Sequence, residues 1–461
     1  MSSLSLAAAK RMLRDHGARR IYAKALAPND NSKNQVYLGG DFEVLQVIPG
    51  SEPVPGVSGT HGEPIFKSAL TFSWLDDEGR AFPAPAAQLI LYPQYPEVRM
   101  SGFLRGARWA PNDVLTVRDE GRVLLLGVTA TEQIFGIAAA SDTPLARELR
   151  GLNDLPTVGV LLDLGVPDGP SAEDSKAELL KRLCEISKKG WIDAWRLLPD
   201  GSRAPCNGTN CVGVTLESEL GILANGRAEP DFLGWEVKAA TVANLAKPRL
   251  GTITLMTPEP SRGFYKEAGV EAFLHRYGYP DKKGRRGRIN FGGIHRVGSR
   301  HPSTSLRLEV AGFDPNTDSV TDSDGHVALV DRAGTIAAAW SFPSLLLHWT
   351  KKHANSAYIP ASASLGNDRK YRYAGTALIA GGTDFLKLLS AITSGAVYYD
   401  PGIKLERTEN GQSTKRRSQW RVNGKDLSAL YRSSEWLDAC AQESVDSRSQ
   451  RWYSAGNSSR T

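Results

Sequence analysis

Short hydrophobic runs separated by turn residues dominate the first third of the chain. Between Ile21 and Leu164, QVYLGG, ALTFSWL, AQLILYP and DVLTVRD alternate with Gly, Pro, Asn and Asp. Runs of this length and punctuation predict β-strands joined by turns. We therefore predict an all-β barrel or sandwich over residues 1–164, with a short amphipathic helix at its start and a second helix at TPLARELRGL.

The pattern changes after residue 164. GVPDGPSAEDS, residues 165–175, has no hydrophobic periodicity and predicts a linker. The next stretch predicts a helix, because hydrophobic residues recur at helical spacing: Leu179, Leu180, Leu183 and Ile186. Strand-like and helical stretches then mix, so we predict an α/β domain over residues 176–461.

GVTLESELGILANG predicts a further helix in this second domain. Leu216, Leu220 and Leu223 would form one hydrophobic stripe. Asn225 and Gly226 would end the helix, because both residue types accept a left-handed backbone.

Composition narrows the class of protein. A chain of 461 residues exceeds one ordinary core, and its 41% hydrophobic content suits a soluble protein. The net charge of +6 permits an anionic partner without requiring one. Of the four cysteines only Cys206 and Cys211 are close in sequence, which disfavours a zinc site and suits reduced thiols in a cytoplasm. No stretch predicts a membrane span.

EPDFLGWEVK, residues 229–238, gathers two acids and a lysine. Asp231 and Glu236 would offer hard oxygen ligands suited to Mg²⁺, and Lys238 could orient a water, which is what phosphodiester hydrolysis requires. Glu236 and Lys238 share one face of a strand, and a turn at Leu233–Gly234 would return Asp231 to it. A surface hairpin with solvated charges remains the alternative.

Two segments concentrate basic residues. DKKGRRGRINFGGIHRVGSRH, residues 281–301, predicts contact with a DNA backbone, and a solvated loop is the alternative. The candidate contacts in this segment are Arg285, Arg286, Arg288, His295 and Arg296. KRRSQWRV, residues 415–422, could read G·C pairs through arginine or could be a charged edge strand.

Several blocks in this half resemble a known family. TLESELGI, EPDFLGWEVKAAT and GTITLMTPEP, in that order, resemble the MvaI/BcnI restriction endonucleases, relatives of the MutH nickase within the PD-(D/E)XK nucleases. The resemblance runs from about Lys181 to Cys440. It implies Asp231, Glu236 and Lys238 as the catalytic triad, with Mg²⁺ on the two acids and Glu217 as an accessory acid. It also implies base contacts by four residues of KRRSQWRV: Arg416, Arg417, Gln419 and Arg421.

The amino-terminal half resembles a second group. KALAPNDNSKNQVYLGG and YPEVRMSGFLRG are similar to the EcoRII effector domain and the BfiI DNA-binding domain, which are pseudobarrels that grip DNA with two loops. One arm would use Lys24, Asn29, Asp30, Asn34 and Gln35, and the other Arg99, Arg105 and Arg108.

Together the resemblances imply a two-domain protein, an all-β pseudobarrel followed by an α/β PD-(D/E)XK nuclease. The expected activity is that of a type IIE-like restriction endonuclease cutting double-stranded DNA at a G·C-rich site of the CCWGG/CCSGG class. We expect a second DNA copy on the first domain, a cognate methyltransferase encoded nearby, a cytoplasmic prokaryotic setting and a monomer. A MutH-like nickase, a methylation-dependent nuclease and a non-cleaving regulator are the alternatives.

Overall fold

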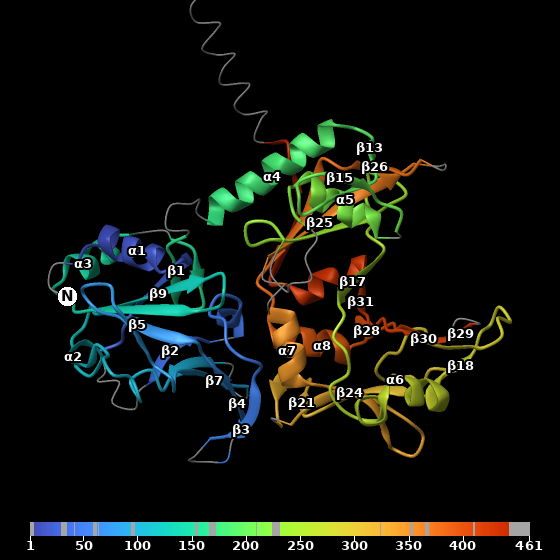
Figure 1. Cartoon of the computed structure of the whole chain (residues 1–461), viewed down its shortest axis with the longest axis horizontal. Coiled ribbons are helices and arrows are strands. Elements are labelled where there is room, and N and C mark those ends of the chain that lie inside the picture. The colour runs from blue at the N-terminus through green and yellow to red at the C-terminus, as the bar shows by residue number, and fades with distance from the viewer. Residues whose placement is uncertain are drawn as a thin grey trace, which may run out of the picture. The chain divides into compact units, whose positions relative to one another are not determined.

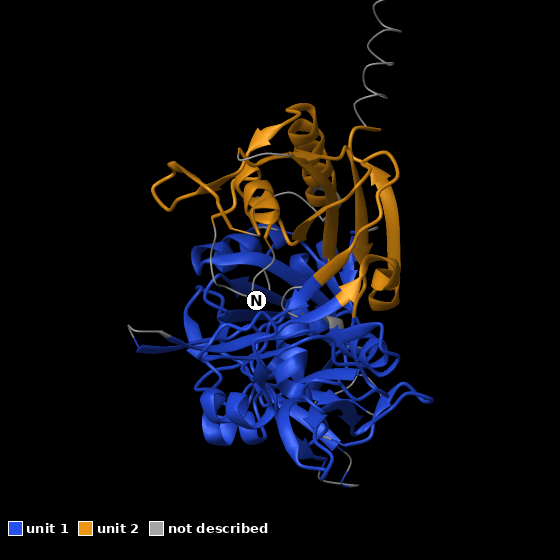
Figure 2. Ribbon diagram, turned by 90° about the vertical axis from the view of Figure 1, so that its right-hand side faces the viewer, with its two compact units in different colours: residues 1–172, 254–351, 384–421 blue, residues 173–253, 352–383, 422–461 orange. Residues whose placement is uncertain are grey.

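The chain forms two compact units that each combine separate stretches of sequence. The computed structural model describes residues 4–28, 35–40, 42–58, 62, 64–93, 97–152, 155–165, 172–208, 210–223, 231–322, 324–350, 353, 355–364, 368–408 and 411–441. Unit 1 comprises residues 1–172, 254–351 and 384–421, and unit 2 comprises residues 173–253, 352–383 and 422–461 (Figure 2).

The first part of unit 1 contains a seven-stranded sheet. Its strands, in spatial order, are β11 (Thr157–Val158), β12 (Leu161–Asp163), β1 (Ala18–Ala25), β9 (Val123–Thr129), β10 (Ile134–Ala139), β5 (Phe72–Leu75) and β6 (Ala81–Pro83). Helices α1 (Leu6–Asp15) and α3 (Pro144–Arg150) lie on one side of β1 and β9 (Figure 1). Their buried Leu13 and Leu145 pack with Ile21 and Leu125 of the sheet, and both helices were predicted.

A second, five-stranded sheet completes this part. Its order is β2 (Gln35–Gly39), β8 (Glu97–Ser101), β7 (Gln88–Tyr92), β4 (Pro64–Ala69) and β3 (Val54–Val57), all antiparallel. A short helix, η1 (Phe42–Gln46), follows β2. The strand-rich character predicted for residues 21–164 is therefore confirmed among the residues that the structure describes.

DVLTVRD is the exception, because it contains a helical turn, α2 (Asn112–Leu115), where we predicted a strand. The fully buried guanidinium of Arg122 explains the difference. It donates hydrogen bonds to the carbonyl oxygens of Val114 at 2.7 Å and Leu115 at 3.4 Å. The last carbonyl groups of a helix have no hydrogen-bond partner within the helix. Arg122, which is not part of the hydrophobic pattern, supplies these partners and so stabilises the turn.

The rest of unit 1 mixes helices with small sheets. The helices are α6 (Phe264–Tyr277), α7 (Phe342–Thr350) and α8 (Phe385–Thr393). One sheet contains β20 (Arg307–Ala311), β23 (His326–Val330) and β24 (Ile336–Ser341), and another contains β18 (Tyr279–Pro280), β19 (Arg288–Gly292), β29 (Gly402–Thr408) and β30 (Gly411–Lys415). The remaining strands are the pair β21 (Phe313–Asp314) and β22 (Ser319–Val320), and the sheet of β17 (Thr252–Met256), β31 (Trp420–Asn423) and β28 (Val397–Tyr399).

Unit 2 is built around one mixed sheet. Its path is β13 (Ile192–Asp193), β26 (Lys370–Tyr373), β25 (Asn355–Ala363), β27 (Thr376–Gly381) and β32 (Ser433–Asp438), and β16 (Glu236–Thr241) pairs in parallel with β25. Two helices, α4 (Ala172–Lys188) and α5 (Cys211–Glu219), contribute to the core of this unit. A hairpin of β14 (Trp195–Leu197) and β15 (Arg203–Pro205), and the short helix η2 (Gly424–Leu430), complete it.

The two helices predicted for this region behave differently. The predicted stripe of α4 is confirmed, since Leu179, Leu183 and Ile186 are buried in the core of unit 2. Helix α5 ends earlier than predicted, because Gly221 adopts a positive φ of 79° directly after the C-cap Leu220. Leu223 is 43% exposed and therefore lies outside the hydrophobic stripe that we assigned to it. Asn225 and Gly226, the predicted end, lie outside the described residues.

The four cysteines form two disulfides, so the expectation of reduced thiols is wrong. Cys184 of α4 bonds Cys440, with Cα atoms 5.1 Å apart. Cys206 bonds Cys211 at the start of α5, with Cα atoms 5.7 Å apart. The first pair is separated by 256 residues and meets only through the fold. In the described part of the chain, no helix is both long and apolar enough to cross a membrane.

Candidate active site

A tight turn brings the two predicted acids and the lysine together at the start of β16. Phe232 and Trp235 exchange two backbone hydrogen bonds, of 2.9 and 2.8 Å, around Leu233 and Gly234. Both central residues have positive φ, 47° and 88°, which is the geometry of a type I′ turn. The bend predicted at this position is therefore confirmed, and it reverses the chain just before β16.

Hydrogen bonds fix the three side chains around this turn. The Asp231 carboxylate accepts a hydrogen bond from the backbone N–H of Val237 at 3.0 Å. The Lys238 ammonium donates to Oε1 of Glu236 at 2.7 Å. Glu236 is buried, with 3% of its surface exposed, and Lys238 is half-buried. A lysine that solvent can reach, Lys238, is therefore hydrogen-bonded to a buried carboxylate, that of Glu236.

The acids repel one another. Burial, together with the negative charges of Glu236 and Glu217, raises the pKa of Asp231 to about 7, while the Val237 amide and Lys238 oppose the shift. Glu217, on α5, is thus close enough to Asp231 for their charges to interact. A cluster of carboxylates with an elevated pKa is stabilised by a bound cation, which replaces the proton.

The donor set fits a hard divalent cation. Among the described residues, no group of three or more His, Cys, Asp or Glu side chains is arranged so that it could hold a metal ion. Mg²⁺ does not need three protein ligands. It is commonly held by one or two carboxylates, with water and phosphate oxygens at its other positions. Asp231 and Glu236 would supply those carboxylates, and Glu217 lies within electrostatic range of them.

Two of the predicted contacts in the first basic segment are exposed. Arg285 and Arg286 lie in the turn between β18 and β19. The guanidinium of Arg285 donates to Asp281 at 3.2 Å. Arg288, on β19, donates to Glu406 at 2.9 Å, and so part of its charge is already compensated.

His295 and Arg296 lie deeper in the same segment. His295 is 1% exposed, and its ring nitrogens are 2.9 Å from the Gly293 carbonyl oxygen and from the Thr304 hydroxyl. Its ring also stacks on that of His301, with centroids 4.5 Å apart. The Arg296 guanidinium lies 4.6 Å from the centroid of the Tyr398 ring. These contacts give His295 a role in holding the segment, and we leave it out of the proposed DNA surface.

The second basic segment, residues 415–422, contains both buried and exposed side chains. Ser418 and Trp420 are buried, whereas Arg416 and Arg417 are exposed. Arg421 is half-buried and donates to Asp400 at 2.8 Å and to Gln419 at 2.9 Å.

The amino-terminal candidates are partly brought together. Arg99 donates to Gln35 at 3.2 Å, so residues from the two predicted arms meet across β2 and β8. Lys24 lies 5.9 Å from the centroid of the Tyr37 ring. Arg105 and Arg108 are exposed. Asn29, Asp30 and Asn34 lie outside the described residues.

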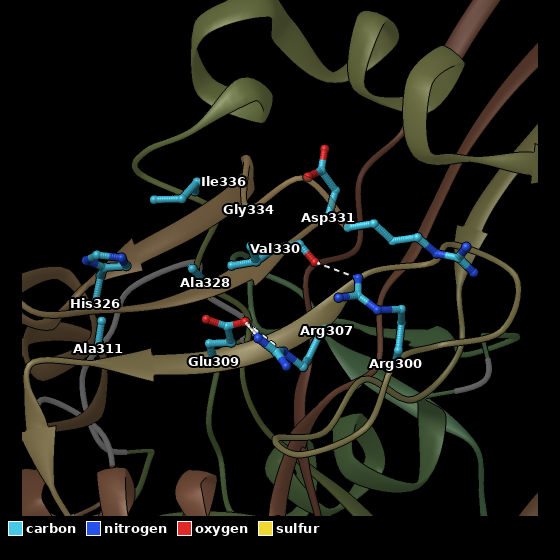
Figure 3. A pocket seen from close by; sticks show the side chains of 11 residues that line it. Arg300, Arg307, Glu309, Ala311, His326, Ala328, Val330, Asp331, Gly334 and Ile336 are labelled. Atoms are coloured by element: carbon cyan, nitrogen blue, oxygen red, sulfur yellow. Dashed lines mark hydrogen bonds and ion pairs between the residues drawn. The ribbon is translucent and has the colours of Figure 1, made fainter.

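A separate cavity of about 370 Å³ opens over the sheet of β20, β23 and β24 (Figure 3). Its lining includes Arg300, Arg307 and Glu309. The Arg307 guanidinium bonds Glu309, and Arg300 donates to the carbonyl oxygens of Ser305 and Val330. None of the predicted catalytic or DNA-binding residues lines it, so this cavity is distinct from the carboxylate site.

Sequence reasoning missed a group of buried hydroxyls beside Glu236. Ser356 and Tyr358 on β25 and Tyr431 after η2 are hydrogen-bonded to one another. No motif could have revealed them, because they join the site only through strand pairing between distant segments.

The match to a known protein family places the chain among nucleases. The chain belongs to the MvaI/BcnI restriction endonuclease family, whose model matches residues 180–431, and this membership implies a nuclease that hydrolyses DNA. The resemblance noted in that region is thereby confirmed. The likeness of residues 1–164 to a pseudobarrel stays a prediction.

The solved structures that are similar to this chain include two of one enzyme. One is the complex of restriction endonuclease MvaI with cognate DNA, at 21% identity over 59% of this chain and 100% of that chain, with a TM-score of 0.43. The other is MvaI in the absence of DNA, at 18% identity over 58% of this chain and 100% of that chain, with a TM-score of 0.33. Comparison with curated proteins gives no match.

Proposed function

We propose that the chain is a Mg²⁺-dependent type II restriction endonuclease that cuts double-stranded DNA at a short, near-palindromic, G·C-rich site of the CCWGG/CCSGG class. The observation that supports this most is the convergence of Asp231, Glu236 and Lys238 at one turn inside the region that matches the family.

The roles of the site residues follow from their chemistry. A bound Mg²⁺ would offset charge on the scissile phosphate and lower the pKa of a water. Asp231 and Glu236 would hold the ion, and Glu217 would add negative charge nearby. The ammonium of Lys238, held by Glu236 at 2.7 Å, would orient the attacking water and offset charge that develops on the phosphate.

DNA contacts would come from both basic segments. The exposed Arg285 and Arg286, with Arg288 and Arg296, suit the phosphate backbone. Arg416 and Arg417 suit guanine edges, which accept two hydrogen bonds from one guanidinium. Gln419 and Arg421, which bond each other, complete the proposed base-reading segment.

Residues 1–164 would form a DNA-binding domain, joined by a linker at 165–175 to a nuclease domain at 176–461. The contact between Gln35 and Arg99, together with the exposed Arg105 and Arg108, supports a DNA surface on the first domain. A second DNA copy bound there would make the enzyme type IIE. We further propose action as a monomer in a prokaryotic cytoplasm, beside a cognate methyltransferase.

Digestion of unmethylated phage DNA tests the proposal. The purified protein is assayed with Mg²⁺ and with a chelator, and the Lys238→Ala variant is assayed with Mg²⁺. We expect discrete metal-dependent fragments that are absent with the variant, and mapping their ends gives the site. DNA binding without cleavage of any substrate would leave a non-cleaving regulator. Single-strand nicks without double-strand breaks would identify a strand nickase.

A further inference from the structure

The turn between β18 and β19 contains a run of basic residues. We refer to residues 282–287, KKGRRG, as the basic loop, which has four positively charged side chains and no acid. Lys283 and Arg286 are exposed and, within the described part of the chain, their side chains have no carboxylate partner. Two cations of the basic loop are therefore available to bind an anion.

The carboxylate of Asp281, directly before the basic loop, fixes the backbone of that loop. Its side chain is 5% exposed, and Oδ2 accepts hydrogen bonds from the backbone N–H groups of Lys283 at 3.2 Å and Arg285 at 3.3 Å. Oδ2 also accepts a hydrogen bond from Nε of Arg285 at 3.2 Å. Aspartate commonly fixes a turn in this way, by bonding the backbone two residues further along. The middle of the basic loop is thus held to its start.

The other carboxylate oxygen holds the basic loop to the strand that follows it. Oδ1 of Asp281 accepts a hydrogen bond from Nδ2 of Asn290 at 2.9 Å and lies 3.4 Å from Nε of Arg288, and both residues are on β19. The end of the loop is bound to β29, because the Gly287 carbonyl oxygen accepts a hydrogen bond from the backbone N–H of Arg407 at 2.9 Å. One carboxylate therefore joins the start, the middle and the return strand of the turn.

The charge of Asp281 by itself disfavours DNA binding. The hydrogen bond from Asn290 is the main cause that holds the pKa of Asp281 well below its usual range, and bonds from Arg285 add to the shift. The carboxylate is therefore ionised at any pH at which a nuclease is assayed. DNA affinity rises with each positive charge placed near a phosphate, so a negative charge beside the basic loop lowers it. A favourable role for Asp281 in DNA binding must come from the order that it gives to the loop.

We propose that Asp281 is a positioning residue for DNA binding, whose hydrogen bonds hold the basic loop in the conformation in which Lys283 and Arg286 contact phosphates of the DNA backbone. The gain from this order exceeds the repulsion between the Asp281 charge and DNA. The inference rests on the proposed function, since it takes the first basic segment as a backbone contact. A loop that is ordered in advance loses less conformational freedom when it binds, and so it binds more tightly.

Three variants separate the charge of Asp281 from its hydrogen bonds. Asp281→Ala removes the charge and every acceptor, whereas Asp281→Asn removes the charge and keeps one oxygen for the backbone N–H groups. Glu406→Gln is the control, because the Glu406 carboxylate bonds Arg288 at 2.9 Å and Lys404 at 2.7 Å, outside the basic loop. Each variant removes one negative charge from the same sheet. If charge alone mattered, all three would bind DNA more tightly.

The decisive readout is the affinity of the full-length protein for a fluorescent DNA duplex, measured by anisotropy in chelator at several salt concentrations. Phosphate contacts do not depend on base sequence, so a duplex of arbitrary sequence is used. We expect Asp281→Ala to bind about 10-fold more weakly, Asp281→Asn to lose less, and Glu406→Gln to bind as tightly as the unmodified protein or more tightly.

The salt dependence reports the number of phosphate contacts. The slope of log affinity against log salt concentration changes by about 0.9 for each contact. Its magnitude should fall by about 1 to 2 in Asp281→Ala, because Lys283 and Arg286 lose their fixed positions, and should not fall in Glu406→Gln. A variant with both Lys283→Ala and Arg286→Ala should show a similar fall.

Amide hydrogen exchange without DNA measures the order of the basic loop directly. The backbone N–H groups of Lys283 and Arg285 should exchange faster in Asp281→Ala, since they lose their acceptor, and at an unchanged rate in Glu406→Gln. Thermal unfolding checks that each variant is folded. If Asp281→Ala is not folded, Asp281→Asn is compared with Glu406→Gln in its place.

Two outcomes would overturn the inference. One is DNA binding by Asp281→Ala that is unchanged or tighter, as the loss of a negative charge alone predicts. The other is unchanged affinity and slope in the variant with Lys283→Ala and Arg286→Ala, which would show that the basic loop does not contact DNA.

Failure of the proposed function gives a different result. Protein that binds DNA with the expected ranking of variants but cuts no DNA would contradict the nuclease assignment and leave the role of Asp281 standing. Protein that cuts DNA at a defined site, but whose Asp281→Ala variant binds DNA more tightly, would contradict the inference alone.

Discussion

His295 shows how one residue's surroundings change its interpretation. In the sequence it lies among arginines and glycines, a setting typical of a DNA contact. In the structure its ring lies between those of Phe291 and His301, and both its nitrogens have partners. A neutral ring suits this site, because a buried imidazolium beside a second histidine would be poorly solvated.

This burial predicts a pH-dependent loss of stability. Desolvation, with a smaller contribution from His301, lowers the pKa of His295 to about 3, against 6.5 in the unfolded chain. Between these values the unfolded state binds more protons, so the free energy of unfolding falls as pH falls below 6.5 and is unaffected above it. The expected contribution is about 2 kcal/mol lost between pH 7 and pH 5.

Urea unfolding of the unmodified protein and of His295→Gln at both pH values measures this effect. Glutamine keeps polar groups for Gly293 and Thr304 but does not titrate in this range. His301, whose own pKa burial lowers, is present in both proteins. The same pH-induced loss in both would mean that His295 does not remain neutral inside the folded chain.

Among the elements, those with strong local signals were predicted well. The hydrophobic residues of helix α4 recur at helical spacing in the sequence, and the side chain of Thr143 caps the start of α3. The turn before β16 was predicted from Gly234. Helix α2 and the end of α5 were not predicted, because α2 depends on hydrogen bonds from the Arg122 side chain and α5 ends at Gly221, which the stripe pattern ignores.

The dependence of α2 on Arg122 can be measured. The guanidinium also donates to the carbonyl oxygens of Asp119 at 2.6 Å and Ala27 at 2.7 Å, so it joins three segments of the chain. Arg122→Met fills much of the space but leaves several buried carbonyl oxygens without donors. We expect urea unfolding to show a loss of about 3 kcal/mol or more.

Two further variants sharpen that experiment. The free energy of unfolding of Arg122→Lys should fall between those of Arg122→Met and the unmodified protein. An ammonium group restores the charge but lacks the planar fork of donors. Arg19→Met, on the exposed side of β1, should stay within about 0.5 kcal/mol of the unmodified protein. If Arg122→Met were as mild as Arg19→Met, α2 would have to be stabilised by local sequence alone.

At the scale of the whole molecule, the sequence predicts that the proposed catalytic residues lie together but not what surrounds them. Asp231, Glu236 and Lys238 lie within eight residues, so their local spacing carried the prediction. Ser356 and Tyr431 reach the same site from other stretches of unit 2, through the pairing of β16 with β25 and the chain after η2. Such non-local contacts leave no periodic trace, and the same is true of Cys184 and Cys440.

The disulfides predict how much this non-local assembly depends on covalent links. The Cys184–Cys440 bond closes a loop of 256 residues, and the Cys206–Cys211 bond closes a loop of five. A cross-link stabilises a protein mainly by restricting its unfolded chain, and by more for a longer loop. Replacing both cysteines of the long loop by serine should therefore cost about 5 kcal/mol, and of the short loop about 2 kcal/mol. The unfolding midpoint in urea should rank the variants in that order.

Dithiothreitol should lower the unfolding midpoint of the unmodified protein. It should leave unchanged the midpoint of a variant in which all four cysteines are replaced. If dithiothreitol had no effect on the unmodified protein, neither disulfide would stabilise the protein in solution.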